Sequence, residues 1–407
     1  MKEELKIRFL SDLIDFKNGK SIKPSSGNIP IYGGNGILGY SEKYNYDNIL
    51  IIGRVGAYCG SIHYHKEKCW VSDNAIAGEV KSDYSIDYLY YLMKSLNLND
   101  RQVGSSQPLL TQGVLNNISV KIYESSQTQQ SIAAVLSALD KKIALNKQIN
   151  AHLEEMAKTL YDYWFVQFDF PDANGKPYKS SGGEMVFDET LKREIPKGWE
   201  VKQISHWIKA DKSGDWGKEQ QEGHYTVKVN CVRGADINAI NSQGNIEAPI
   251  RFILAKNAHK LLSPFDFVVE ISGGSPTQST GRLAPISQYV LERFDLPLIC
   301  SNFCKAISLK DTSYFYQFAF MWSDIYKNNI LFGWEGKTSG IKNLLFDNFV
   351  NGYFECFPPK EIAEQFFKII DKNHQEQQLL LKQNHQLTQL RDFLLPMLMN
   401  GQVSVAE

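Results

Sequence analysis

Two stretches of this chain, 234 residues apart, carry the same amphipathic pattern. The shift aligns Ile132 with Phe366, Leu136 with Ile370 and Asn150 with Asn384. The first stretch runs from residue 127 to about 164 and the second from about 361 to 395. Apolar residues recur at every third or fourth position over each stretch, which is typical of long helices that pack lengthwise on one another. We therefore predict two long helices that pair antiparallel as the chain folds back on itself.

A second echo opens each half of the chain. Residues 6–11 (KIRFLS) resemble residues 200–205 (EVKQIS) at a shift of 194. Together the two echoes predict a tandem duplication with pseudo-two-fold organisation, in which each copy is a globular unit followed by a long helix. At about 1.5 Å per residue the first helix would be roughly 55–60 Å long. It would then hold the globular units a fixed distance apart. The alternative is two unrelated amphipathic helices, each docked on its own domain.

The globular parts have the composition of a loop-rich α+β fold. The apolar run at residues 49–52 is followed by Gly53, and the strand predicted at residues 264–271 ends in Ser-Gly-Gly-Ser. Residues 86–98 and 315–326 show helical spacing. Residues 171–183 are rich in Pro, Gly and Ser, which indicates an exposed linker. The predicted organisation is a first globular domain at 1–125, a central helix at 126–168, a linker at 169–195, a second globular domain at 196–357 and a distal helix at 358–400.

Length and composition place the chain among ordinary globular proteins. It has 407 residues, 43% of them hydrophobic and 22% charged, and no stretch of about 18 apolar residues that would indicate a membrane span. The start of the chain lacks the apolar core of a signal peptide, and six scattered cysteines suit a reducing compartment. We expect a cytoplasmic protein that has no association with a membrane.

Catalytic and metal motifs are weak or missing. Cys59, His63, His65 and Cys69 do not have the spacing of a usual structural zinc site, so strands with ordinary thiols are the preferred interpretation. Cys300 and Cys304 lack companion ligands and suggest buried thiols. The Walker-like end at residues 333–338 lacks its first glycine, and the G-x-G-x-x-G at residues 34–39 is not followed by a helical pattern. We predict no metal site and no catalytic residues, which leaves binding as the function.

The net charge of -1 restricts how such a chain could bind nucleic acid. Proteins that bind DNA alone through phosphates usually have a basic surface, because each neutralised phosphate releases counterions. A neutral chain either does not bind nucleic acid, or it reads bases while a partner neutralises the phosphates.

Several segments, taken in order, resemble one family over essentially the whole chain. They are residues 30–40 (PIYGGNGILGY), 51–57 (IIGRVGA), 104–110 (GSSQPLL), 153–168 (LEEMAKTLYDYWFVQF), 272–275 (SGGS) with Gly281 and Arg282, and 394–403 (LLPMLMNGQV). This set is similar to the specificity subunits of type I restriction-modification systems, including their duplication and the ends of their long helices.

The resemblance implies a DNA sequence-specificity subunit that is not itself an enzyme. Such a subunit reads a bipartite target in double-stranded DNA, with one half-site for each target-recognition domain. Its helices set the spacing and dock two adenine methyltransferase (modification) subunits, and restriction subunits with translocase and endonuclease activity can join. The family thus implies that this chain binds no cofactor and that S-adenosylmethionine, ATP and Mg belong to the partner subunits. A non-catalytic scaffold that bridges two partners without reading DNA is the alternative.

Base readout needs hydrogen-bond donors and acceptors on loops that reach the major groove. In the first domain the candidate residues are Tyr32, Asn35, Arg54, Tyr58, Ser105, Ser106 and Gln107. In the second they are Lys212, Ser213, Ser275, Thr277, Gln278, Arg282, Lys337, Thr338 and Ser339. The candidates for the helix seam and for subunit docking are Leu136, Ile143, Asn150, Leu153, Leu160, Ile370, Leu380, Asn384, Leu387 and Leu394.

Overall fold

The chain forms two units, and the boundaries between them fall inside its two long helices. The computed structural model describes residues 4–101, 109–241, 246–273, 277–338 and 341–405. Unit 1 comprises Met1–Ala144 together with Gln386–Glu407, and unit 2 comprises Leu145–His385. Each long helix therefore contributes residues to both units. Within the described ranges, no helix combines the length and the apolar character needed to cross a membrane.

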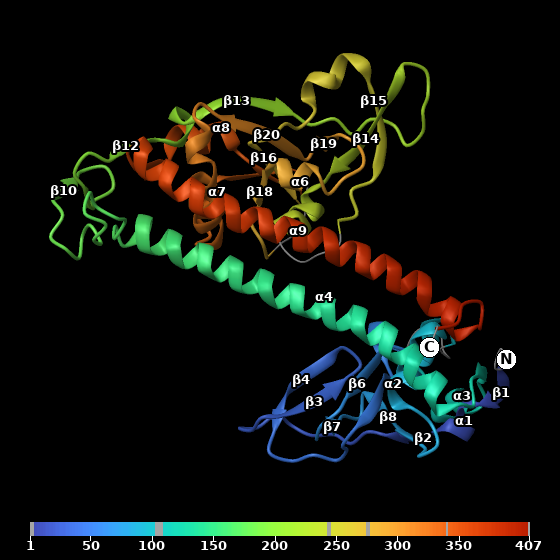
Figure 1. Ribbon diagram of the computed structural model, residues 1–407. Helices are drawn as coiled ribbons and strands as arrows, with labels where there is room; N and C mark the ends of the chain where they lie inside the picture. The colour runs from blue at the N-terminus through green and yellow to red at the C-terminus, as the bar shows by residue number, and fades with distance from the viewer. Residues whose placement is uncertain (1–3, 102–108, 242–245, 274–276, 339–340, 406–407) are drawn as a thin grey trace. The chain divides into compact units, whose positions relative to one another are not determined.

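The larger sheets among the described residues of unit 1 have four and three strands (Figure 1). The first is antiparallel, in the order β2-β8-β5-β6. Its strands are β2 (Ile14–Asn18), β5 (Ile49–Gly53), β6 (Ile62–His65) and β8 (Ala75–Val80). In the second, of order β4-β3-β7, β3 pairs antiparallel with β4 but parallel with β7. Its strands are β3 (Ile29–Gly33), β4 (Gly36–Ser41) and β7 (Trp70–Val71).

The core of unit 1 lies where these strands meet its helices. Strand β5 is buried along its whole length, as expected of an unbroken apolar run. Helix α2 (Ile86–Ser95) packs its apolar face on the same core, and the Ser85 hydroxyl caps it by accepting from the Tyr88 amide. The shorter helices are α1 (Leu10–Leu13) and α3 (Gln112–Asn116).

Unit 2 repeats both sheets in the same order. The antiparallel sheet runs β13-β20-β16-β18 and the smaller sheet β15-β14-β19. The strands of the first are β13 (Ile208–Ser213), β16 (Asp266–Glu270), β18 (Leu283–Ile286) and β20 (Cys304–Leu309). Those of the second are β14 (Tyr225–Val232), β15 (Ile250–Leu254) and β19 (Leu298–Cys300). Strands β14 and β19 are parallel, as β3 and β7 are in unit 1.

Further elements of unit 2 complete this frame. Its helices are α5 (Ile237–Asn241), α6 (Gln288–Leu291), α7 (Phe315–Lys327) and α8 (Phe346–Gly352). A third sheet, of order β17-β22-β21, consists of β17 (Ser272–Gly273), β21 (Glu335–Thr338) and β22 (Ile341–Leu344).

Each copy also begins and ends with the same pair of strands. In unit 1, β1 (Lys6–Phe9) pairs antiparallel with β9 (Ser119–Ile122). In unit 2, β12 (Glu200–Gln203) pairs antiparallel with β23 (Phe354–Phe357). The sequence echo at a shift of 194 falls on β1 and β12, and a long helix follows β9 and β23. The predicted α+β tandem duplication is therefore confirmed by strand order as well as by sequence.

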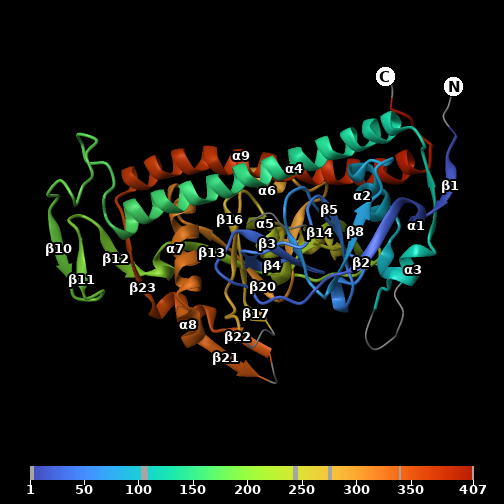
Figure 2. The ribbon, with the colours of Figure 1, turned by 90° about the horizontal axis from the view of Figure 1, so that it is seen from below.

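The two long helices are α4 (Ser126–Tyr161) and α9 (Lys360–Met399). Within each unit, the segments of the two helices run side by side in opposite directions (Figures 1 and 2). In unit 1, Leu136 near the start of α4 shares a core with Leu398 near the end of α9. In unit 2, Tyr161 at the end of α4 and Phe366 near the start of α9 lie with their ring centroids 6.3 Å apart. The antiparallel pairing predicted from the sequence is correct.

The predicted linker at 169–195 contains regular structure, which corrects the view of it as a plain exposed connection. Strands β10 (Met185–Asp188) and β11 (Arg193–Pro196) form a hairpin. Phe170 is buried and stacks on Tyr178 with ring centroids 4.7 Å apart, and it also contacts Trp199 at 5.3 Å. The Pro, Gly and Ser content misled the prediction because a few aromatic side chains suffice to anchor such a segment on the core of unit 2.

Candidate nucleic-acid interface

Four pairs of matched backbone hydrogen bonds show which loops correspond in the two units. In unit 1 they are Ser72 N to Tyr32 O, Ala75 N to Ser72 O, Arg54 N to Asn74 O and Lys20 N to Val71 O, at 2.9–3.0 Å. In unit 2 they are Ser301 N to Val232 O, Cys304 N to Ser301 O, Ile271 N to Phe303 O and Asp215 N to Cys300 O, at 2.8–2.9 Å. The loop after β3 thus corresponds to the loop after β14. The turn between β7 and β8 corresponds to the turn between β19 and β20.

A glycine marks the same close approach in both units. A Cβ on Gly19, after β2, would lie 1.9 Å from the Ser72 carbonyl oxygen. A Cβ on Gly214, after β13, would lie 1.9 Å from the Ser301 carbonyl oxygen. Only glycine fits either position, so the chain is held against the β7–β8 and β19–β20 turns. The duplicated frame therefore fixes the backbone of these loops.

In unit 1 the structure brings the predicted loops at Tyr32–Asn35 and Arg54–Tyr58 together. The Gly34 carbonyl oxygen accepts from the Ser61 hydroxyl and lies 3.1 Å from His63 Nε2. Asn35 and Tyr58 are exposed, with 52% of Tyr58 accessible. These two side chains therefore project from a backbone that is itself held in place.

Tyr32 and Arg54 are half-buried. The Tyr32 hydroxyl lies 3.2 Å from His65 Nδ1, and burial raises the pKa of Tyr32. Arg54 donates from Nη1 to the Asp73 carbonyl oxygen at 3.4 Å, and its buried Nε has no partner among the described residues. The remaining unit 1 candidates, Ser105, Ser106 and Gln107, lie outside the described residues.

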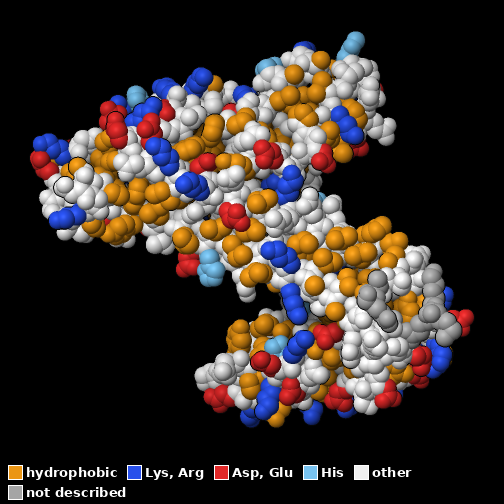
Figure 3. Space-filling model, in the orientation of Figure 1, with side chains coloured by type: hydrophobic (Ala, Val, Ile, Leu, Met, Phe, Trp, Pro, Cys, Tyr) orange, Lys and Arg blue, Asp and Glu red, His pale blue; other side chains and the backbone are white. Residues whose placement is uncertain are grey.

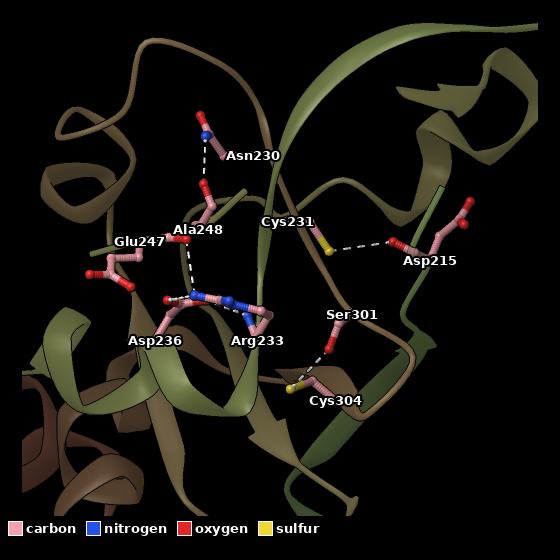
Figure 4. Close-up of polar contacts among 9 residues, drawn as sticks. All are labelled: Asp215, Asn230, Cys231, Arg233, Asp236, Glu247, Ala248, Ser301 and Cys304. Atoms are coloured by element: carbon pink, nitrogen blue, oxygen red, sulfur yellow. Dashed lines mark hydrogen bonds and ion pairs between the residues drawn. The ribbon is translucent and has the colours of Figure 1, made fainter. Parts of the chain in front are cut away.

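In unit 2 the corresponding loops surround a cavity of about 410 Å³. It is lined by Trp216, Arg233, Gly234, Ala235, Glu270, Ser272, Ser301, Asn302 and Phe303. Figure 4 shows Arg233 pointing at Asp236, to which its Nε and Nη2 donate at 2.9 and 3.0 Å. Arg233 Nη2 also donates to the Glu247 carbonyl oxygen at 3.0 Å. Arg233 is therefore engaged in holding its loop.

Two of the basic residues predicted to contact DNA in unit 2 are paired with buried carboxylates. Lys212 Nζ lies 2.9 Å from Asp266 Oδ2. Arg282 donates to both Glu270 oxygens, at 2.6 and 2.9 Å, and the hydrogen bond with Glu270 raises the pKa of Arg282. If such a cation moved away, the carboxylate would remain buried as an unpaired charge, which is strongly destabilising. The structure therefore gives both residues a structural role rather than a free charge.

The other unit 2 candidates are placed as follows. Ser213, Thr277 and Gln278 are exposed. Lys337 and Thr338 belong to β21. Ser275 and Ser339 lie outside the described residues. Trp216, Asn302 and Phe303 line the cavity but were not among the candidates. The likeness of the Ser301 turn to the Ser72 turn is a signal for Asn302 and Phe303 alone.

The cysteine and histidine residues weighed as zinc ligands have other roles. His63 and His65 contact the Gly34 carbonyl and the Tyr32 hydroxyl, and Cys59 and Cys69 are buried. Burial raises the pKa of Cys69 to about 12, which disfavours the thiolate that a metal needs. Throughout the described ranges, no three His, Cys, Asp or Glu side chains are grouped so that they could hold a metal ion.

Comparison with known proteins gives consistent results. Residues 2–155 match the family model described as the type I restriction modification DNA specificity domain. The chain is 28% identical over 334 residues to the type I restriction enzyme MjaIX specificity subunit of Methanocaldococcus jannaschii, covering 79% of this chain and 70% of that one. It is 31% identical over 146 residues to the EcoprrI specificity subunit of Escherichia coli, covering 34% of this chain and 36% of that one.

A solved structure shares the fold over almost the whole length. The crystal structure of the type I restriction-modification system S subunit from M. genitalium aligns with a TM-score of 0.66 at 14% identity, covering 98% of this chain and 96% of that one. The chain is therefore similar to type I restriction enzyme specificity subunits in sequence, and it shares the fold of one over almost its whole length. The resemblance found in the sequence is therefore confirmed.

A polar layer lies in the seam between the two long helices. Within unit 2, Asn146 Nδ2 donates to Asn384 Oδ1 at 3.0 Å and to Gln383 Oε1 at 3.3 Å. Asn150 is 1% exposed, and its Nδ2 donates to the Gln377 carbonyl oxygen at 3.5 Å. The buried Oδ1 atoms of Asn146 and Asn150 have no partner among the described residues. Such a layer specifies helix register at a cost in stability.

The predicted seam residues of this chain are turned inward. Leu136, Ile143, Asn150, Ile370, Leu380 and Asn384 are buried, and Leu153, Leu160, Leu387 and Leu394 are half-buried. Side chains that pack within the chain offer little surface to a partner. Docking therefore requires other residues on the helices.

The 234-residue shift also pairs exposed apolar residues on the two long helices. Leu145 and Leu379 are 49% and 48% exposed, and Met156 and Leu390 are 61% and 45% exposed. Leu145 and Met156 are eleven positions apart in α4, about three turns, so they fall on one side of that helix. Exposed apolar side chains can be lost from either copy after a duplication, so duplication alone does not explain why both helices have them.

Proposed function

We propose that this chain is the DNA sequence-specificity subunit of a type I restriction-modification complex and that it reads a bipartite target, one half-site per unit. The observation that carries the proposal is the duplicated frame with unlike loops. The same two sheets hold the same turns, but Asp73 and Asn74 in unit 1 stand where Asn302 and Phe303 stand in unit 2. A fixed frame with variable exposed side chains suits two readers of different sequences.

The charge distribution supports a division of labour with partner subunits. The net charge is -1, and on the face shown in Figure 3 basic and acidic side chains are interspersed rather than gathered into one field. Reading bases requires hydrogen-bond donors and acceptors, whereas affinity for DNA comes largely from neutralised phosphates. We infer that modification subunits supply much of the contact with the phosphates.

We further propose that two modification subunits dock on the long helices, and that restriction subunits can join this assembly. Two copies of one partner need two matching surfaces, and the exposed pairs Leu145 with Met156 and Leu379 with Leu390 are related by the internal repeat. This chain would bind no cofactor and perform no catalysis itself. S-adenosylmethionine, ATP and Mg would act in the partner subunits.

The helix surfaces can be tested separately from DNA reading. The double variant Leu145→Lys with Met156→Lys on α4 is expected to remove one of two modification subunits, as measured by mass photometry of the purified complex. Leu379→Lys with Leu390→Lys on α9 is expected to remove the other. These side chains are exposed, so the isolated chain should keep its melting temperature. Retention of both partner copies by both variants would contradict the docking proposal.

DNA reading is tested by co-expressing the chain with a cognate modification subunit and mapping methylation across a genome. The expected result is one split target sequence that is methylated wherever it occurs in the genome. DNA binding should weaken steeply as the salt concentration rises. A stable complex with no sequence preference and no dependence on DNA would instead support the alternative, a scaffold that bridges two partners.

A further inference from the structure

We infer that the loops around the unit 2 cavity read an A·T base pair, with Asn302 on the adenine and Phe303 with Trp216 against the thymine methyl group. The inference rests on the proposed DNA-reading function and adds the residues and the base. It starts from the turn between β19 and β20, which matches the Ser72 turn of unit 1 hydrogen bond for hydrogen bond.

Phe303 is an exposed aromatic side chain on a fixed backbone. It is 57% exposed, and its carbonyl oxygen accepts from the Ile271 and Ser272 amides at 2.9 and 3.2 Å. Asn302 beside it is also exposed. A large apolar side chain that is exposed to solvent on a rigid turn is well placed to bind DNA, because the turn has little conformational entropy left to lose on binding.

Trp216 supplies the second apolar wall of the cavity and is held in place. The Arg251 guanidinium lies 3.9 Å from the centroid of the Trp216 ring, and Arg251 also pairs with Glu219 at 3.0 Å. The cavity between these walls, about 410 Å³, admits a group from the major-groove edge of a base. Thymine is the base that presents an apolar group there, its C5-methyl.

The charged residues of the cavity disfavour the other readouts. Guanine is read mainly by a bidentate Arg or Lys, but Arg233 is held by Asp236 and Arg282 by Glu270. Cytosine donates its amino group to a free carboxylate, but Glu270 is already occupied by Arg282. An exposed Asn remains, and Asn pairs with the N6 and N7 atoms of adenine. An A·T pair presents the adenine N6 and N7 atoms to the Asn302 amide and the thymine methyl group to the apolar walls formed by Trp216 and Phe303.

The test uses the complex of this chain with its modification subunit and duplexes that carry the mapped target. Each thymine of both half-sites is replaced in turn by uracil, which lacks the methyl group. One replacement is expected to weaken binding about 4-fold, the effect of one buried methyl. Phe303→Ala should bind the thymine and uracil duplexes equally. Asn302→Ala should weaken binding about 5- to 150-fold and relax specificity at that base pair alone.

Phe187→Ala is the matched control, because Phe187 is 59% exposed on the β10–β11 hairpin of the same unit. It should leave target and affinity unchanged. Wild-type affinity and target for both Asn302→Ala and Phe303→Ala, or insensitivity of the wild type to every uracil, would overturn this inference while the proposed function stands. A wild-type complex without any split target would instead overturn the proposed function.

Discussion

Replacing Asn150 with leucine is expected to stabilise the protein, although it removes a hydrogen bond. The bond from Asn150 Nδ2 to the Gln377 carbonyl oxygen is 3.5 Å long, at the limit of useful geometry. The Oδ1 atom of Asn150 is buried without a partner among the described residues. A buried polar atom that lacks a partner costs about 1–3 kcal/mol, whereas an ordinary hydrogen bond contributes about 0.5–1.5 kcal/mol. We expect a net gain of about 1 kcal/mol.

Asn146→Leu is the matched control on the same face of α4. It removes the same kind of buried acceptor but also loses two bonds, at 3.0 and 3.3 Å, to Asn384 and Gln383. It should be neutral or destabilising by up to about 1 kcal/mol. The assay is the melting temperature of the purified chain, where 1 kcal/mol corresponds to about 2–4 °C for a domain of 150–250 residues. An Asn150→Leu protein that melts at or below the wild type would refute the reasoning.

The same substitution tests the role of the polar layer in helix register. An apolar seam tolerates sliding that a buried amide forbids. We therefore expect the Asn150→Leu complex to methylate targets with more than one spacer length. A single unchanged spacing would show that register is fixed elsewhere.

The remaining predictions concern packing, pH and an ion pair. Gly214→Ala should destabilise unit 2 by about 2–5 kcal/mol, because its Cβ would lie 1.9 Å from the Ser301 carbonyl oxygen. The control Gly333→Ala, whose Cβ would have no atom within 4 Å, should change stability by less than about 0.5 kcal/mol. Equal urea midpoints for the two variants would contradict this prediction. Burial lowers the pKa of His374 to about 4, so the neutral ring is favoured in the fold and stability is lost as pH falls from about 6.5 toward 4. His374→Asn should remove about 2 kcal/mol of the stability difference between pH 7.5 and pH 5, and parallel pH profiles would exclude this role. Arg391→Met breaks a partly exposed pair with Asp140 at 2.8 Å and should cost about 1 kcal/mol or less, with a smaller effect at high salt in urea titrations.

The long helices were predictable because their determinants are local. Apolar spacing along α4 and α9 identifies both the helix and the face that is buried, so residues such as Leu136 and Ile370 follow from pattern alone. The Asn positions were also visible as breaks in that pattern. The hydrogen-bond partners of these Asn residues could not be predicted, because they depend on the register between the two helices.

The equivalence of the globular parts could not be seen in the sequence beyond its first strand. The matched residues Tyr32 and Val232 are 200 positions apart, Arg54 and Ile271 are 217, and Ser72 and Ser301 are 229. Insertions between strands change the sequence offset between corresponding residues from one loop to the next. The backbone hydrogen bonds preserve the same fold in both units, because they do not depend on the identity of the side chains. Strand order therefore shows a correspondence that spacing conceals.

The candidate DNA-facing residues were chosen by chemical type, which does not show whether a side chain is already engaged. Lys212 and Arg282 suit phosphate or guanine contact by type, yet each is paired with a carboxylate on strand β16. Phe303 was not among the candidates, because the choice favoured side chains that donate or accept hydrogen bonds. Only the fold shows it to be exposed.

The most direct test of the account is methylation mapping with paired loop variants of the reconstituted complex. One variant carries Asp73→Ala and Asn74→Ala in unit 1, and the other carries Asn302→Ala and Phe303→Ala in unit 2. The account predicts that each variant alters the bases accepted in one half-site only, a different half-site for each variant, with the spacer unchanged. Changes in both half-sites from one variant, or in neither half-site from both, would contradict the claim that each unit reads its own half-site.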